Sequence, residues 1–187
     1  MERPDGDSGP ASEPPSRSVS RESADPTPVS GAVEWLLVVA LLAAPMAVVP
    51  GGDDAPTLVS LWGFVTLGGD GSGLGGYPVW AYFLDQPRPF ATLPPSIRAW
   101  PLALGFHLLA TGSATSGVAL GREDRRVTGG VLVLGAAATL WVAAGLGVRF
   151  GVGTTAGWLT VLPVSALATL AVAVAAYGGD LRRIVTH

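Results

Sequence analysis

The side chains best suited to chemistry form one polar stripe inside a long apolar segment. His107 lies in the run 99–121, which contains no Asp, Glu, Lys or Arg, and Thr111 and Thr115 follow it at i+4 and i+8. That spacing places the three on one helix face. An ionisable group near mid-membrane is by default a hypothesis of function, so the stripe could pass a proton or a small solute.

A structural interpretation of His107 competes with the relay. A neutral histidine can hydrogen-bond a neighbouring helix and act only to hold a bundle together. We favour this interpretation, because the apolar segments contain no acid placed to partner His107; Glu34 would sit at an interface.

Small residues spaced by four line nearly the opposite face of the same helix. They are Ser113, Gly117 and Gly121. Small side chains at this spacing let helix backbones approach closely in a membrane. We therefore expect the helix to have neighbours on two sides. Because glycine and alanine are abundant throughout, we favour packing within the chain over a dimer seam, and the oligomeric state stays open.

Five consecutive charged residues separate this segment from the uncharged run 127–148. They are Arg122, Glu123, Asp124, Arg125 and Arg126. Each charge at the bilayer centre costs roughly 2.5 to 3.5 kcal/mol, so a charged turn between two uncharged runs indicates a transmembrane hairpin. The turn could dock a cytoplasmic partner or anionic lipid headgroups. We favour a topological role, in which the arginines hold one side of the membrane and the two acids pair or cap.

The composition excludes several kinds of site. The 187 residues include no cysteine and two histidines, and 13% are charged against 49% hydrophobic. Disulfides, iron–sulfur clusters and thiolate zinc sites are ruled out, and we expect no metal and no cofactor. The net charge of −3 resides in residues 1–32, and no basic patch indicates nucleic acid. No motif of a catalytic nucleophile or zinc protease is present.

Four apolar segments are candidates to cross a bilayer. We predict spans at about 33–49, 97–120, 127–147 and 156–177. Residues 1–32, rich in Pro, Ser and acids, are predicted to be a disordered cytoplasmic tail, followed by a transmembrane domain over 33–180 and a short C-terminal tail over 181–187. The predicted fold is all-α: an integral membrane four-helix bundle with a disordered N-terminal tail and an interfacial external loop layer.

Residues 57–84 are the least regular part of the chain. Two apolar pieces, 58–67 and 77–84, carry all six aromatic side chains of this region but are too short to cross. Tryptophan and tyrosine prefer the headgroup level of a membrane. The pieces could be interfacial, re-entrant or the two parts of a broken extra span.

Arginine counting orients the predicted spans. With four spans, both termini share one side with the turn at 122–126. That side holds Arg3, Arg17, Arg21, Arg122, Arg125, Arg126, Arg182 and Arg183, whereas the other holds Arg88, Arg98 and Arg149. The excess of eight over three places both termini in the cytoplasm of a multi-pass cell-membrane protein.

Three pieces of the sequence resemble an uncharacterised family of small four-pass membrane proteins from halophilic archaea. They are the hairpin 122–134, the region 51–65 and the pair Trp100-Pro101. The resemblance covers roughly residues 35–177, and the hairpin is its most specific part. It implies a fold and no known activity.

Two positions depart from the family pattern. Pro45-Met46 stands where family members often have Pro-Trp, and Ala81-Tyr82 stands where they have Asp-Tyr. The acidic tail is an addition to the family pattern, and it fits a halophilic source, as does the absence of lysine.

These features predict a non-enzymatic accessory or structural membrane protein. Its expected partners are the lipid bilayer and another membrane protein that the sequence does not identify. The alternative is a small transporter or channel-like protein that uses the stripe from His107 to Thr115. A membrane enzyme is a third, weaker option.

Overall fold

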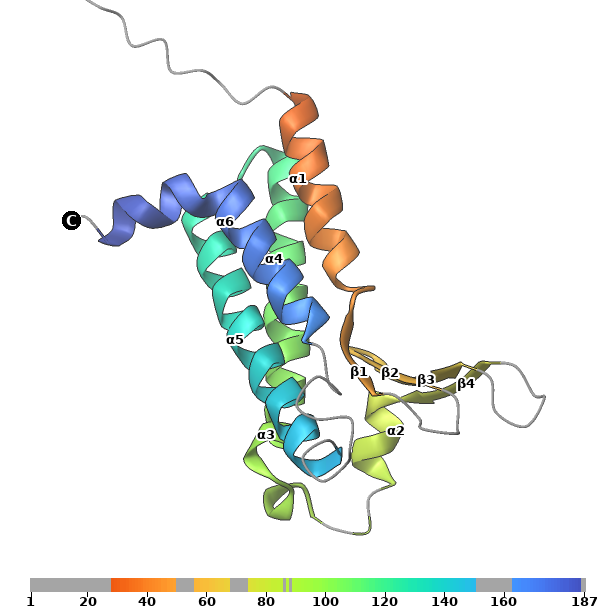
Figure 1. Ribbon diagram of the computed structural model, residues 1–187. Coiled ribbons are helices and arrows are strands. Elements are labelled where there is room, and N and C mark those ends of the chain that lie inside the picture. Colours follow the sequence, from red (N-terminus) through yellow and green to blue (C-terminus); the bar gives the residue numbers. More distant parts are fainter. Residues whose placement is uncertain are drawn as a thin grey trace, which may run out of the picture.

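The computed structural model describes residues 28–49, 56–67, 74–85, 87, 89–150 and 163–185. Long helices form an elongated bundle, and a small sheet projects from one end of it (Figure 1). The helices are α1 (Pro28–Leu41), α2 (Val79–Leu84), α3 (Pro95–Arg98), α4 (Trp100–Leu120), α5 (Arg125–Phe150) and α6 (Val164–Val185), with a short 3-10 turn at Phe90–Thr92.

Four strands form one antiparallel sheet in sequential order. They are β1 (Pro45–Val49), β2 (Thr57–Ser60), β3 (Gly63–Leu67) and β4 (Leu74–Pro78). The prediction of an all-α bundle was therefore wrong. The region 57–84, predicted as interfacial, re-entrant or a broken span, folds in its described part into β2, β3, β4 and α2.

The prediction of one helical span over 33–49 is wrong because of Pro45. The predicted span 33–49 divides into helix α1, which ends at Leu41, and strand β1, which begins at Pro45. Proline disfavours helical geometry for the residue before it and donates no backbone hydrogen bond, so the helix ends before Pro45. The indole of Trp62 then donates to the carbonyl of Leu42, at 2.9 Å, and satisfies an acceptor just past the end of α1.

The hairpin between β2 and β3 depends on one glycine. Gly63 pairs with Ser60 and has φ of +147°, a backbone conformation that favours glycine. A Cβ at Gly63 would stand 2.1 Å from the carbonyl oxygen of Tyr77 on β4. The close approach of β4 therefore requires glycine at this position.

The sheet is attached to the bundle through an aromatic cluster. Trp100 is fully buried, and its indole donates to the carbonyl of Leu61 at 3.1 Å. Phe64 and Tyr82 pack against Trp100, with ring centroids 5.1 and 6.0 Å away. Because Trp100 begins α4, these contacts fix the sheet at the N-terminal end of that helix.

A second core lies toward the other end of the bundle. It joins four helices, and its buried members are Val38, Leu41, Ala110, Ala114, Leu132, Ala173 and Tyr177. Gly129 of α5 lies so close to α6 that an added Cβ would be 2.8 Å from the Cβ of Tyr177. Small residues thus permit close packing of α5 and α6.

Three described helices are long and apolar enough to cross a membrane. They cover Pro95–Leu120, Arg125–Val148 and Val164–Arg182, and they suggest a membrane protein. Four spans were predicted, but the apolar stretch Gly31–Leu41 is shorter than the other three. Residues 151–162, where the predicted fourth span begins, and residues 1–27 of the predicted tail lie outside the described residues.

Helix α6 changes direction near its C-terminal end. Figure 1 shows the last part of the helix turning away from the bundle axis. The helix contains the pair Gly178-Gly179, and paired glycines are a common cause of such bends. Beyond the bend, the last part of α6 projects to the side of the bundle (Figure 1).

Candidate functional site

His107 lies in the packed centre of the bundle, with an exposed fraction of only 2%. Its Nδ1 is 2.8 Å from the carbonyl oxygen of Ala103, which can only accept, so Nδ1 carries the proton. In a neutral imidazole Nε2 is then an acceptor, and the Thr169 hydroxyl of α6 donates to it at 3.0 Å. Both ring nitrogens are therefore engaged within the fold.

The surroundings of the imidazole are tightly packed. A Cβ at Gly135 of α5 would stand 3.0 Å from Cε1 of the ring. Thr169 is fully buried, as is Thr139, whose hydroxyl donates to the carbonyl of Gly135 on its own helix. Helices α4, α5 and α6 thus meet around His107, which hydrogen-bonds Thr169 of α6 and packs against Gly135 of α5.

The predicted polar stripe does not converge on one point. The hydroxyl of Thr115 donates to the carbonyl of Thr111 at 2.7 Å and accepts from the indole of Trp35 on α1 at 3.0 Å. The hydroxyl oxygen of Thr111 is buried, with no hydrogen-bond partner among the described residues. His107 bonds to α6, whereas Thr115 bonds to α1, so the two ends of the stripe contact different helices.

The three small residues on α4 have separate environments. Ser113 shares a hydrogen bond of 2.7 Å with Thr128 of α5. Gly117 accommodates the side chain of Glu123, since an added Cβ would be 2.6 Å from the Cβ of that residue. Gly121 ends α4 in the left-handed conformation, with φ of +64°, which closes the helix before the charged turn.

Arg125 joins three helices at the charged turn. Its guanidinium bonds both carboxylate oxygens of Glu34 on α1, and its Nε lies 3.1 Å from Oδ2 of Asp180 on α6. It also donates to the carbonyl of Ala176 at 2.6 Å and lies 5.0 Å from the ring centre of Tyr177. The N-terminal part of α1 and the C-terminal part of α6 are thereby fixed at the start of α5.

The other charged residues of the turn differ in orientation. Oδ1 of Asp124 accepts from the backbone N–H groups of Arg126 and Val127, at 3.1 and 3.3 Å, and so caps the N-terminus of α5. The side chain of Glu123 lies against Gly117 with Oε1 buried. Arg122 and Arg126 are exposed.

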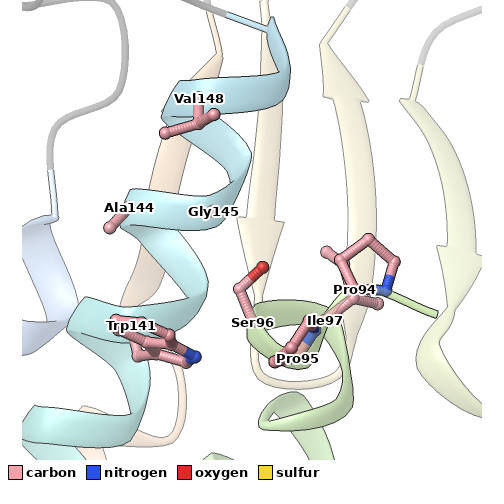
Figure 2. Close-up of a pocket in the computed structure, with 8 residues that line it drawn as sticks. All are labelled: Pro94, Pro95, Ser96, Ile97, Trp141, Ala144, Gly145 and Val148. Carbon is pink, nitrogen blue, oxygen red and sulfur yellow. The ribbon is translucent and has the colours of Figure 1, made fainter. Parts of the chain in front are cut away.

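An apolar groove lies between α3 and α5 (Figure 2). Its volume is about 340 Å³, and it is lined by Pro94, Pro95, Ser96, Ile97, Trp141, Ala144, Gly145 and Val148. Trp141 and Val148 are also exposed on the surface of the bundle. The polar side-chain groups of the lining are the Ser96 hydroxyl and the Trp141 indole N–H, and these two groups do not form a catalytic constellation.

Residues 15–187 match a domain of unknown function, DUF8050. The chain belongs to this family. No curated protein matches it. The resemblance to an uncharacterised family is confirmed at that level, and the halophilic archaeal source remains a prediction.

Sequence reasoning about this DUF8050 chain missed the partners of its polar groups. It found His107 and the charged turn, but not Thr169, Glu34 or Asp180 as their partners. The partner of His107 is not an acid but a hydroxyl 62 positions away in the sequence. Within the described residues, no three histidine, aspartate or glutamate side chains gather as metal ligands; the expected absence of a metal or cofactor stays a prediction.

Proposed function

We propose that this protein is an integral membrane protein with a non-enzymatic, structural or accessory role. The observation that carries the proposal is the bonding of His107, whose two ring nitrogens connect to Ala103 and Thr169 in a buried setting. Interhelical hydrogen bonds of this kind stabilise membrane bundles. A relay group must instead exchange its proton with a path to water.

Both termini lie on the same side of the membrane in this proposal. Glu34 near the start of α1 and Asp180 near the end of α6 bond the same arginine. The sheet, held by Trp100 at the other end of α4, would lie at the opposite membrane surface. Arginine counting favours the cytoplasm for the side that holds Arg125.

Helix α1 and strand β1 would carry the chain across between these two surfaces. The 14 residues of α1 reach only about 21 Å as a helix, less than the roughly 30 Å of a bilayer core. Strand β1 continues the path, pairs with β2 and lies against α5 and α6. Non-helical backbone at membrane depth is tolerated where protein buries it in this way.

A proton-flux measurement separates the structural role from the transporter alternative. The purified protein is reconstituted into liposomes that contain a pH-sensitive dye, and a pH gradient is imposed. We expect the gradient to decay as slowly as in protein-free liposomes. A faster decay that His107→Leu abolishes, while the variant stays folded in the liposomes, would establish the alternative and overturn the proposal.

A further inference from the structure

The apolar groove between α3 and α5 reaches the outer surface of the bundle (Figure 2). Trp141 and Val148 of α5 line it and are 57% and 73% exposed. Its described lining contains no charged residue, so an ion would lose its hydration there without compensation. The volume of about 340 Å³ is at the lower end of the range for ligand pockets, which begins at roughly 300 Å³. The groove therefore suits one uncharged, mainly aliphatic group.

The groove depends on small residues of α5 opposite α3. A Cβ on Gly145 would stand 2.0 Å from the Oγ atom of Ser96, so the Ser96 side chain lies directly against the backbone of α5. The preceding residue, Ala144, is exposed and contributes only a methyl group to the lining. A larger side chain at Ala144 would occupy the groove without entering the core of the bundle.

Two hydrogen-bond donors of the lining are unused. The indoles of Trp35, Trp62 and Trp100 donate to acceptors within the protein. In contrast, the Trp141 indole and the Ser96 hydroxyl have no hydrogen-bond partner among the described residues. Figure 2 shows the indole nitrogen of Trp141 directed toward α3. A matching occupant would combine an aliphatic part with neutral acceptor oxygens.

The depth of the groove indicates the source of such an occupant. Along α5, Gly145 lies about 30 Å from Arg125, at 1.5 Å per residue, and the hydrocarbon core of a bilayer is also roughly 30 Å thick. With Arg125 at one membrane surface, as proposed above, Gly145 and Ser96 lie at the opposite hydrocarbon boundary, and Trp141 lies one helical turn deeper. The ester groups that join acyl chains to phospholipid headgroups occupy this boundary.

We infer that the groove binds one phospholipid from the leaflet on the side of the sheet. One acyl chain lies between α3 and α5, and the ester oxygens accept hydrogen bonds from Ser96 and Trp141. Burial of the chain supplies most of the affinity, whereas the hydrogen bonds fix its depth. The inference rests on the proposed membrane role, because that role places the groove at the ester level of a bilayer.

Lipid titration followed by native mass spectrometry tests the site. The full-length protein is delipidated in a mild detergent, and phosphatidylcholine is added stepwise. We expect one lipid to bind the wild type before any others do. Ala144→Phe, which fills the groove, should raise the Kd of this lipid by about tenfold or more, the effect of losing the burial of one aliphatic side chain. Ala137→Phe, at an exposed alanine two turns away on the same helix face, is the matched control and should leave the Kd unchanged.

Ser96→Ala tests the polar contact separately. It should raise the Kd by about fivefold, the effect of one hydrogen bond of ordinary net strength, and it decides the question if Ala144→Phe does not fold. An unchanged Kd in Ser96→Ala would contradict the inferred pose. Random binding of several lipids without a first site, or equal effects of the two phenylalanine variants, would overturn the inference. A dimer that Ala144→Phe dissociates would also overturn it, because a second copy would then fill the groove.

Extraction from membranes distinguishes failure of the groove from failure of the membrane role. The wild type is reconstituted into phosphatidylcholine liposomes and washed with alkaline carbonate, which removes proteins that do not cross the bilayer. Release of the protein would refute the proposed membrane role. Protein that stays in the liposomes but binds no lipid specifically in the titration would refute the groove alone.

Discussion

Removing the hydroxyl of Thr169 should weaken the bundle through His107. Thr169→Val keeps the shape of the side chain but leaves Nε2 of the imidazole without a donor. Thr169 is fully buried and His107 nearly so, and their mutual hydrogen bond accounts for both polar groups without a transport path. The expected loss is therefore one of stability.

The size of this loss follows from interhelical hydrogen bonds measured in membrane proteins. Such bonds average about 0.6 kcal/mol and reach about 1.7 kcal/mol. Both polar atoms here are buried and the distance is 3.0 Å, so we expect a loss in the upper part of this range, about 1 to 1.7 kcal/mol in the free energy of unfolding. His107→Leu should cost a similar or larger amount, since it also changes packing against Gly135.

A double-mutant cycle in mixed micelles isolates the pair. Unfolding by dodecyl sulfate is followed through tryptophan fluorescence for the wild type, both single variants and the double variant. The coupling energy should be about 1 kcal/mol. Thr111→Val is the matched control, because its hydroxyl has no described partner, and it should change stability by less than about 0.5 kcal/mol. A coupling energy of zero, or equal losses for Thr111→Val and Thr169→Val, would refute the reasoning.

Two further substitutions test the ends of the molecule. Arg125→Met should lower the free energy of unfolding by about 2 to 4 kcal/mol in the same titration, because two partly buried carboxylates lose the guanidinium that they bond. Arg126→Met, at the exposed neighbouring residue, is the control and should lower it by under about 0.5 kcal/mol. Similar losses for both variants would contradict the bonding of Arg125 to α1 and α6. Gly63→Ala should destabilise the sheet by about 2 to 4 kcal/mol, since its Cβ would meet the Tyr77 carbonyl. Thermal unfolding followed by circular dichroism measures this effect. Gly75→Ala is the control and should destabilise the protein far less, because its added Cβ would lie 4.0 Å from the nearest atom. Equal effects of the two substitutions would refute the hairpin geometry.

The long uncharged runs were sufficient to predict α4 and α5. The run 99–121 contains α4 and the run 127–148 lies within α5, because segments of this length without charge have few alternatives to a helix. The sheet could not be predicted in the same way. Its strands have only four or five residues, and β1 follows α1 inside one apolar stretch, where hydropathy does not distinguish helix from strand.

The candidate site shows the same division between local and distant information. The position of His107 within an apolar segment is a local feature and was found. The bond at its Nε2 depends on Thr169 of α6, which only the packing of α6 against α5 brings near. Likewise, Arg125 was recognised as part of a charged turn, but its bonds to Glu34 and Asp180 depend on how α1 and α6 end.

In the proposed topology the chain crosses a membrane with its termini on one side and the sheet region on the other. Because the sequence contains no cysteine, single cysteines can be introduced by Ser12→Cys near the N-terminus and by Ala91→Cys in the exposed 3-10 turn that precedes α3. Intact cells are treated with a maleimide that does not cross membranes. We expect labelling of the Ala91 position in intact cells and of the Ser12 position only after permeabilisation. Labelling of both positions from outside, or of neither before permeabilisation, would contradict it.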